Sequence, residues 1–218
     1  MDFINLQKQY QQIKQSINED ILNILETSNY ILGEEVFKLE NYLADYVGVK
    51  ECVTCASGTD ALLIPLMAKN IKKGDAVFTT NFSYFATAEV ISLVGAHPIF
   101  VDIDKRSFNI DPDFLENIII DTLSKGDYIP KAIIAVDLFG QPANYKKIKH
   151  IAKKYDLYLI EDAAQSFGAT IDSQKSCSFG DVGATSFYPS KPLGCYGDGG
   201  AIFTNDSKMA DIFRSIRV

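Results

Sequence analysis

Apolar residues recur at every third or fourth position through most of the first fifty residues. Two runs show this spacing, and they are separated by the segment YILG, which ends at Gly33. Their members are Leu6, Tyr10, Ile13, Ile17 and Ile21 in the first run, and Val36, Leu39, Leu43 and Val47 in the second. This spacing matches the 3.6 residues of an α-helical turn, so each run predicts an amphipathic helix. Residues 1–50 are therefore expected to form an N-terminal helical arm.

From residue 51 onward, short β-branched or apolar runs alternate with helical ones. This alternation is typical of a mostly parallel sheet that is covered by helices on both faces. Seven strands are predicted near residues 51–56, 75–80, 98–103, 131–137, 157–161, 184–188 and 200–204. The helices between and after them are predicted to start near Gly58, Tyr84, Asp111, Asn144 and Ser207. The predicted fold class is α/β, with a seven-stranded sheet between helices in one domain of residues 51–218.

The composition indicates a folded protein whose ligand is a small molecule. The chain has 218 residues, of which 47% are hydrophobic, enough for one well-packed domain with an appended arm. Its net charge of −7 disfavours nucleic acid and anionic membrane surfaces as partners, because both attract clustered Lys and Arg. The chain start interleaves polar and apolar positions, unlike a signal peptide, and we find no segment of membrane-spanning length. A cytoplasmic location is expected.

The four cysteines do not form a pattern typical of metal ligands or disulfides. Cys52 and Cys55 make a C-x-x-C, but they lie in a predicted strand, where positions i and i+3 face opposite sides of the sheet. Cys177 and Cys195 lack that spacing, and the chain has only two histidines. No metal site is expected.

The first predicted strand runs into ASGTDALL, which opens a helix. Ser57, Gly58 and Thr59 form a turn at the helix N-terminus, where free backbone N–H groups and the positive end of the helix dipole suit a phosphate. The alternative is an ordinary N-cap with Asp60 in the first turn. The segment lacks the Lys of a Walker motif and the third glycine of a dinucleotide fingerprint, which excludes both of those sites.

Further polar groups follow two later strands. Glu161 and Asp162 end the fifth strand, and because neighbouring strand residues face opposite sides, only one of them can address a ligand. The other acid can cap the next segment. Lys191 follows the sixth strand, which is expected to neighbour the fifth. Because ligands of such sheets bind at the carboxyl ends of the strands, a phosphate site, a carboxylate and a lysine are expected at one sheet edge.

This set of groups suits pyridoxal phosphate. The Lys191 amine would form a Schiff base with the aldehyde of the cofactor, and the carboxylate would keep the pyridine nitrogen protonated. The phosphate would lie at Gly58 and Thr59. Four glycines soon after the lysine predict backbone with positive φ or with close approach to a neighbouring group. They are Gly194, Gly197, Gly199 and Gly200.

Six motifs, in order along the chain, resemble those of the DegT/DnrJ/StrS sugar aminotransferases, a family within the fold type I pyridoxal-phosphate enzymes. The motifs are YILGEEV (30–36), ASGTDAL (56–62), FSYFATAEV (82–90), VDLFGQPA (136–143), EDAAQSFGA (161–169) and ATSFYPSKPLGCYGDGGAI (184–202). The resemblance implies a large domain like that of aspartate aminotransferase and a homodimer. It also implies transfer of an amino group from L-glutamate to a keto group of a nucleotide-linked deoxysugar, in the synthesis of surface polysaccharide or glycan precursors. Pyridoxamine phosphate would be the intermediate form of the cofactor.

The resemblance implies two catalytic residues. Lys191 would hold the cofactor and move protons as general base and acid, and Asp162 would pair with the pyridine nitrogen. Some relatives carry Asn after this lysine, whereas this chain has Pro192, which has no backbone N–H to donate. A dehydratase branch of the family resembles this chain but carries His in place of the lysine, so Lys191 favours transamination.

The resemblance also implies five further contacts with the cofactor. Gly58 and Thr59 would bind its phosphate, with Ser186 as an additional donor. Gln165 would lie near the phenolic oxygen, and Tyr84 would stack on the ring. Judged from the residues alone, Tyr84 is better explained as a core aromatic, and Ser186 equally well as a strand-end hydroxyl.

Two other functions are compatible with parts of the sequence. Asp102-Ile103-Asp104 could be the D-x-D motif of a metal-dependent glycosyltransferase, although acids at i and i+2 of a strand commonly face solvent. The chain ends at FRSIRV, where the family continues into a smaller C-terminal domain that helps to close the site. We expect that domain to be absent from this chain, so the alternative is a truncated, non-catalytic cofactor-binding remnant or partner subunit.

Overall fold

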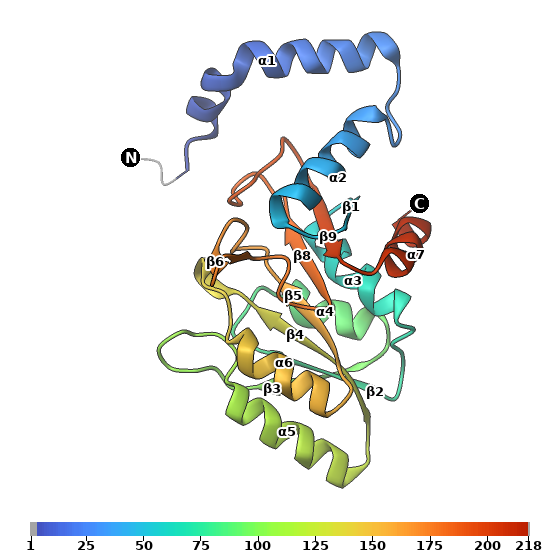
Figure 1. The fold of residues 1–218 in the computed structure, drawn as a ribbon, viewed down its shortest axis with the longest axis vertical. Coiled ribbons are helices and arrows are strands. Elements are labelled where there is room, and N and C mark those ends of the chain that lie inside the picture. The colour runs from blue at the N-terminus through green and yellow to red at the C-terminus, as the bar shows by residue number, and fades with distance from the viewer. Residues whose placement is uncertain (1–3, 218) are drawn as a thin grey trace.

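The computed structural model describes residues 4–217 and has an α/β architecture (Figure 1). Its helices are α1 (Leu6–Thr27), α2 (Glu34–Val47), α3 (Gly58–Ala68), α4 (Ala86–Leu93), α5 (Pro112–Lys125), α6 (Tyr145–Lys154) and α7 (Ser207–Arg217), with a 3₁₀ turn η1 (Leu138–Gly140). Its strands are β1 (Glu51–Cys55), β2 (Asp75–Thr80), β3 (His97–Val101), β4 (Ile129–Val136), β5 (Tyr158–Asp162), β6 (Thr170–Ile171), β7 (Gln174–Lys175), β8 (Val182–Ser186) and β9 (Gly200–Thr204). The seven predicted strands and seven predicted helices are confirmed.

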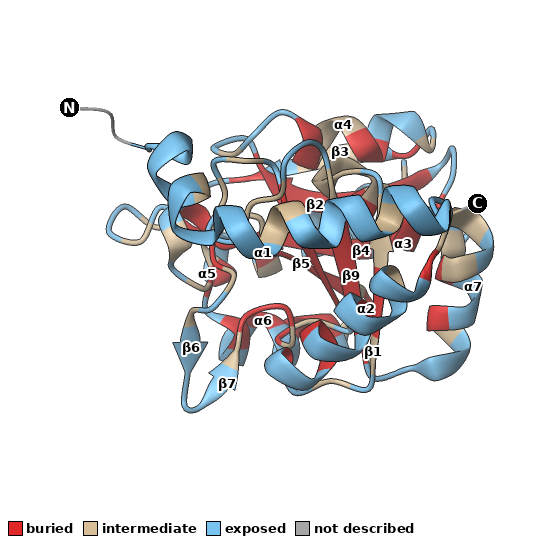
Figure 2. Ribbon diagram, turned by 90° about the horizontal axis from the view of Figure 1, so that it is seen from above, coloured by how far each residue is buried: buried red, intermediate tan, exposed pale blue. Residues whose placement is uncertain are grey.

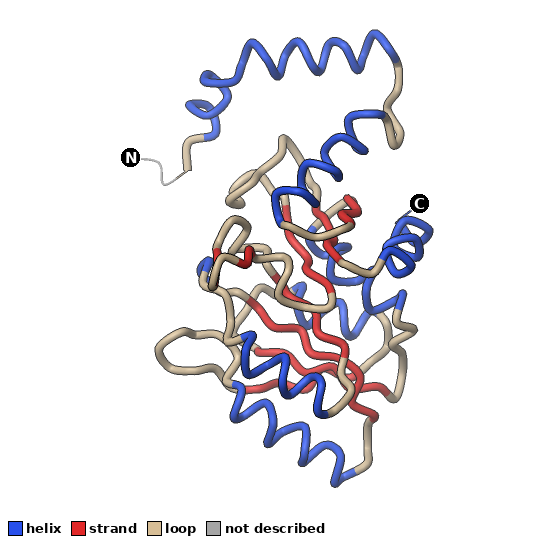
Figure 3. Tube along the Cα trace, viewed as in Figure 1, coloured by secondary structure: helices blue, strands red, loops and turns tan. Residues whose placement is uncertain are grey.

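Seven strands form one sheet in the order β1-β9-β8-β5-β4-β2-β3. Strand β9 runs antiparallel to both of its neighbours, β1 and β8, whereas the other pairs are parallel. The sheet is therefore mostly parallel, as predicted. Its central strands lie inside the molecule between helices, which Figure 3 shows as strands enclosed by helical segments. The hairpin of β6 and β7 was not predicted, because two-residue strands show no period.

Alternate residues of the sheet pack against different helices. In β4, Ile133 belongs to the core cluster that includes Leu115 of α5 and Ile148 of α6. The next residue, Ile134, belongs to the cluster that includes Leu62 of α3 and Phe213 of α7. This period of two explains why the strand reads as a continuous apolar run, because both of its faces are buried.

Helix α5 shows how local signals set the bounds of these elements. The side chain of Asp111 accepts hydrogen bonds from the backbone N–H groups of Asp113 at 2.8 Å and Phe114 at 3.2 Å. Pro112 occupies the first turn, where its missing N–H costs nothing. Gly126 ends the helix with φ of 71°, which a residue with a side chain adopts at a cost.

The N-terminal arm differs between its two helices. Helix α2 packs on the sheet, where Leu43 and Val47 share a core cluster with Phe203 of β9. Helix α1 crosses above the rest of the molecule, and none of its residues 6–27 is buried (Figures 1 and 2). The ring of Tyr10 lies 6.3 Å from the ring of Tyr196, between centroids. Among the helices described, none has both the length and the apolar character that crossing a membrane requires.

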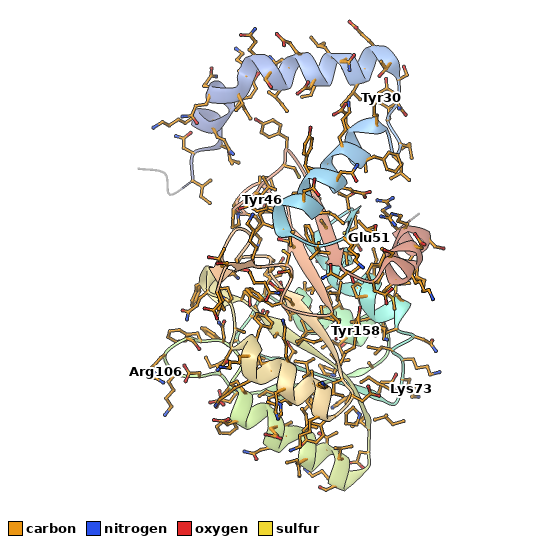
Figure 4. The ribbon with its side chains drawn as sticks, in the orientation of Figure 1. Tyr30, Tyr46, Glu51, Lys73, Arg106 and Tyr158 are labelled. Atoms are coloured by element: carbon orange, nitrogen blue, oxygen red, sulfur yellow. The ribbon has the colours of Figure 1, made fainter. Side chains whose placement is uncertain are left out.

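Helix α7 ties the end of the described chain to β1 and α2. Arg214 pairs with Glu51 at 2.7 Å on the side of β1 that faces α7 (Figure 4). Arg217 pairs with Glu40 of α2, and both side chains are nearly inaccessible to solvent. The Glu40 carboxylate also accepts a hydrogen bond from the backbone N–H of Thr54 at 2.8 Å. These contacts join elements that are far apart in sequence.

Candidate active site

One cavity of about 480 Å³ opens where several strands end and α3 begins. Strands β5 and β8 are paired neighbours, with Asp162 opposite Ala184 in the register, so their carboxyl ends meet at this edge. All seven residues predicted as site residues line this cavity. They are Gly58, Thr59, Tyr84, Asp162, Gln165, Ser186 and Lys191. The structure thus brings together groups that are up to 133 positions apart in the chain.

The N-terminus of α3 forms one wall of the cavity. Ser57 is the N-cap, and its side chain accepts a hydrogen bond from the backbone N–H of Asp60 at 3.1 Å. The capping alternative is therefore correct. It is compatible with anion binding, because the backbone N–H groups of Gly58 and Thr59 are in the first turn of the helix and have no intrahelical acceptor. A Cβ on Gly58 would lie 2.5 Å from the Cβ of Ser186, so only glycine fits between α3 and β8.

Asp162 supplies a buried carboxylate to the cavity. Its Oδ2 accepts a hydrogen bond from the Thr87 hydroxyl at 2.9 Å, and its Oδ1 accepts one from the backbone N–H of Ala164 at 3.2 Å. Burial raises the pKa of the Asp162 carboxyl, while these two hydrogen bonds and the charge of Lys191 oppose that rise. A cation placed against this carboxylate would replace the solvation that burial has removed.

Glu161 faces away from the cavity, as the alternation of strand residues predicted. Its carboxylate accepts hydrogen bonds from the backbone N–H groups of Cys177 and Phe179, the latter at 2.6 Å. It therefore holds the segment that leads into β8. Of the two acids, the structure turns Asp162 toward the ligand cavity and assigns the capping position to Glu161.

Lys191 lies in a tight turn after β8, where its backbone N–H donates to the carbonyl of Tyr188 at 2.8 Å. The four glycines that follow it were expected to have positive φ or to approach a neighbouring group closely, and the structure confirms only part of this. None of Gly194, Gly197, Gly199 and Gly200 has positive φ. Three of them do meet a neighbour closely, since a Cβ would approach Pro189 from Gly194, Cys195 from Gly199, and Ser57 from Gly200. The expectation of positive φ was wrong for all four glycines, and close approach accounts for three of them but not for Gly197, where an added Cβ would have no neighbour within 4 Å.

Tyr84 and Gln165 border the cavity in different ways. The side chain of Tyr84 is 73% exposed, which contradicts its interpretation as a core aromatic and leaves its ring available to a ligand. The side-chain oxygen of Gln165 accepts a hydrogen bond from the backbone N–H of Phe139 at 2.7 Å.

The sequence analysis missed two hydroxyls of the same wall. The Thr87 hydroxyl contacts Asp162, and it is itself 2.9 Å from the hydroxyl of Ser83. Ser83 lies in the bend that precedes α4, and its hydroxyl reaches Thr87 in the first turn of the helix, four positions later. That spacing, next to a strand end, was the available signal.

The two acids of the D-x-D motif, Asp102 and Asp104, stabilise a turn by accepting hydrogen bonds from nearby backbone N–H groups. Asp104 Oδ1 accepts hydrogen bonds from the backbone N–H groups of Arg106 at 3.1 Å and Ser107 at 2.9 Å, and Asp102 Oδ1 accepts one from Ile103 at 2.8 Å. Within residues 4–217, no cluster of three or more His, Cys, Asp or Glu side chains is arranged to hold a metal ion. These observations do not favour the glycosyltransferase alternative.

Comparison with known proteins gives a consistent result. The model of the DegT/DnrJ/EryC1/StrS aminotransferase family matches residues 11–218. This chain belongs to that family. It is 51% identical to the UDP-2-acetamido-2-deoxy-3-oxo-D-glucuronate aminotransferase of Pseudomonas aeruginosa, over 99% of this chain and 58% of that protein. The chain spans about half the length of the curated relatives it matches.

Solved structures of the family share the fold. A DegT/DnrJ/EryC1/StrS aminotransferase from Brucella abortus superposes with a TM-score of 0.98 at 51% identity, covering 99% of this chain and 58% of that one. NtdA from Bacillus subtilis, solved with bound cofactor PMP, gives a TM-score of 0.84 at 31% identity, covering 93% of this chain and 44% of that one. The predicted fold and the resemblance to this family are confirmed.

The cavity fits the cofactor that the family implies. It offers a buried carboxylate at Asp162, a lysine at Lys191 and a helix N-terminus at Gly58 that is closely packed against Ser186. These groups match the three charged or reactive parts of pyridoxal phosphate, which are the pyridine nitrogen, the aldehyde and the phosphate.

Proposed function

We propose that this protein is a pyridoxal-phosphate-dependent aminotransferase that moves an amino group from L-glutamate to a keto group of a nucleotide-linked sugar. The observation that carries the proposal is the meeting of Lys191 and the buried Asp162 with the N-terminus of α3 in one cavity. The similarity to an aminotransferase of a UDP-linked 3-oxo sugar supports a substrate of that class, with the amino group added at carbon 3.

Each residue has a task that its position allows. When bound, pyridoxal phosphate supplies an aldehyde for the lysine and a ring that withdraws electrons. The Nζ atom of Lys191 takes a proton from the substrate carbon and later returns it, as general base and then acid. The carboxylate of Asp162 stabilises positive charge on the ring nitrogen, and its hydrogen bonds with Thr87 and Ala164 keep it oriented.

The remaining cavity residues bind and orient the cofactor. The N–H groups of Gly58 and Thr59 and the hydroxyl of Ser186 bind its phosphate, where the helix dipole also favours negative charge. The exposed ring of Tyr84 stacks on the pyridine ring. Gln165 binds the phenolic oxygen.

We further propose that two copies of the chain associate. Helix α1 carries apolar side chains that are 40% to 54% exposed at Leu6, Ile13, Ile21 and Leu25, and their spacing puts them on one side of the helix. A contiguous apolar surface of this kind is typical of an interface between proteins. A homodimer would bury these side chains.

The test of the cofactor assignment is covalent fixation. The purified protein is mixed with pyridoxal phosphate, reduced with borohydride and digested, and the modified peptide is identified by mass spectrometry. The adduct is expected on Lys191 and absent from Lys191→Ala. The control is Lys175→Ala, because the Lys175 ammonium lies over the Tyr46 ring, 3.7 Å from its centroid, and should react little. An adduct that persists in Lys191→Ala would overturn the assignment.

The test of the reaction is transfer to keto sugars. The protein is incubated with glutamate and either a UDP-linked 2-acetamido-2-deoxy-3-oxo sugar or a nucleotide-linked 4-keto sugar, and amino-sugar products are measured. Product from the 3-oxo substrate alone is expected. Fixation at Lys191 without product from either substrate would favour a non-catalytic cofactor-binding protein.

A further inference from the structure

The loop between β4 and α6, residues 137–144, is held by two buried side chains. Asn109, which is 2% exposed, accepts a hydrogen bond from the backbone N–H of Leu138 at 2.9 Å and donates one to the carbonyl of Gln141 at 2.8 Å. Asp137 is fully buried and accepts a hydrogen bond from the backbone N–H of Ala143 at 3.0 Å. The backbone between Leu138 and Gln141 is thus fixed at both of its ends.

Phe139 lies between these two anchor points in an unfavourable conformation. Its φ of 57° and ψ of 19° place it in the left-handed region, which costs a residue with a side chain about 1 kcal/mol or more. Burial of the side chain does not explain this conformation, because the Phe139 ring is 71% exposed. The backbone N–H of Phe139 donates to the side-chain oxygen of Gln165 at 2.7 Å. The fixed loop therefore holds this N–H against Gln165.

This contact decides which way the Gln165 amide is turned. A glutamine side chain has one acceptor oxygen and one donor NH₂ group, and a backbone N–H can pair only with the oxygen. The NH₂ group is then the part of the amide that remains for a ligand in the cavity that Gln165 lines.

We infer that Asn109 and the backbone N–H of Phe139 are positioning groups that fix Gln165 as a hydrogen-bond donor to a negatively charged oxygen of the bound ligand. This inference rests on the proposed function, in which that oxygen is the phenolic oxygen of the cofactor. Neither Asn109 nor Phe139 is among the residues that line the cavity, so both act through Gln165.

The positioning has a measurable electrostatic consequence. In the bound cofactor, a negative phenolic oxygen would attract the proton on the nitrogen that joins the cofactor to Lys191. A donor that stabilises the oxygen weakens this attraction, so the proton leaves at a lower pH. Loss of the positioning groups should therefore raise the pH midpoint of the visible absorption of the bound cofactor. One net hydrogen bond of about 1 kcal/mol corresponds to about 0.7 pH unit.

Two pairs of variants isolate this effect. Phe139→Pro removes the N–H and forces φ to negative values, whereas Phe139→Gly keeps the N–H and adopts positive φ without strain. Asn109→Ala removes the anchor of the loop. Its matched control is Asn144→Ala, because Asn144 also accepts a backbone hydrogen bond, from Lys147 at 3.3 Å, at the far end of the same loop.

The experiment has one readout with cofactor and one without it. With cofactor, Phe139→Pro and Asn109→Ala are expected to raise the pH midpoint by about 0.7 unit, and the two controls to leave it unchanged. Without cofactor, hydrogen exchange at the Phe139 amide is expected to be slow in the unmodified protein and in Asn144→Ala, and faster in Asn109→Ala and Gln165→Ala.

The outcomes separate this inference from the proposed function. An unchanged midpoint in Asn109→Ala that binds cofactor fully would overturn the inference, whether or not Phe139→Pro folds. Equal exchange of the Phe139 amide in all four proteins would overturn it as well. A failure of the proposed function would appear differently, as the absence of a borohydride-fixed adduct on Lys191 in the unmodified protein.

Discussion

Replacing Asp137 with Asn should change how the stability of the protein depends on pH. The Asp137 carboxylate is fully buried, and it accepts hydrogen bonds from the hydroxyls of Tyr145 at 2.7 Å and Ser166 at 2.8 Å and from the backbone N–H of Ala143. Burial outweighs these donors and raises the pKa of Asp137 from 3.8 to about 6, with a further contribution from the charge of Asp162. The ionised form is therefore less stable in the fold than in the unfolded chain.

The direction of the effect follows from proton binding. Between pH 4 and 6 the folded state holds the Asp137 proton, whereas the unfolded state has lost it. The free energy of unfolding contributed by this group therefore falls as the pH rises through that window and is level above it. A difference of about two pKa units corresponds to about 3 kcal/mol. Burial also raises the pKa of the neighbouring Glu161, which contributes in the same direction in both proteins.

The amide that Asp137→Asn introduces is neutral at every pH, and it can accept a hydrogen bond from Tyr145 and donate one to the Ser166 hydroxyl. The difference in unfolding free energy between Asp137→Asn and the unmodified protein should therefore shift by about 3 kcal/mol in favour of Asp137→Asn as the pH rises from 4 to 7. Urea denaturation at a series of pH values measures this, with tyrosine fluorescence as the signal because the chain has 11 Tyr and no Trp. The control is Asp113→Asn, since the Asp113 side chain is 79% exposed. Parallel stability curves for Asp137→Asn and the unmodified protein would refute this reasoning.

Three further changes test other parts of the structure. Gly58→Ala places a Cβ 2.5 Å from the Ser186 Cβ, so it should cost about 1 to 3 kcal/mol in urea denaturation and weaken cofactor binding in a titration. Unchanged affinity for the cofactor would contradict the assignment of the phosphate to this helix end. Asp162→Asn should retain cofactor fixation but slow the single-turnover reaction with glutamate at least about 100-fold, because a neutral amide does not stabilise the protonated ring nitrogen. An unchanged rate would remove Asp162 from catalysis. Arg217→Met leaves the buried carboxylate of Glu40 without its cation and should cost about 3 to 5 kcal/mol in urea denaturation. A loss below about 1 kcal/mol, the value typical of an exposed pair, would show that solvent reaches Glu40.

Much of the fold could be predicted because its signals are local. The starts of the predicted strands and helices lie within about two residues of those observed, since periodicity, caps and turn residues act over one or two turns of chain. The same reasoning placed Glu161 and Asp162 on opposite faces of β5. It missed the hairpin of β6 and β7. For the glycines after Lys191 it was wrong about positive φ, whereas close approach to a neighbouring group accounts for three of the four.

The sequence by itself determined which chemical groups are present, the elements that carry them, and the strand ends that they follow. It also determined that α1 would be an amphipathic helix, since that depends only on the spacing of its apolar residues. Whether that helix packs on the domain depends on the rest of the molecule, and the structure leaves it exposed.

Only the tertiary structure decided how the groups of the site meet. Thr87 contacts Asp162 across 75 positions of the chain, and Phe139 contacts Gln165 across 26. No local feature of the sequence identifies the partner of either residue, because a hydrogen bond across a sheet edge depends on strand order and register. Strand order and register are set by the packing of whole helices and strands against one another. That packing is the sum of many small contacts between distant segments, so a short stretch of sequence does not encode it.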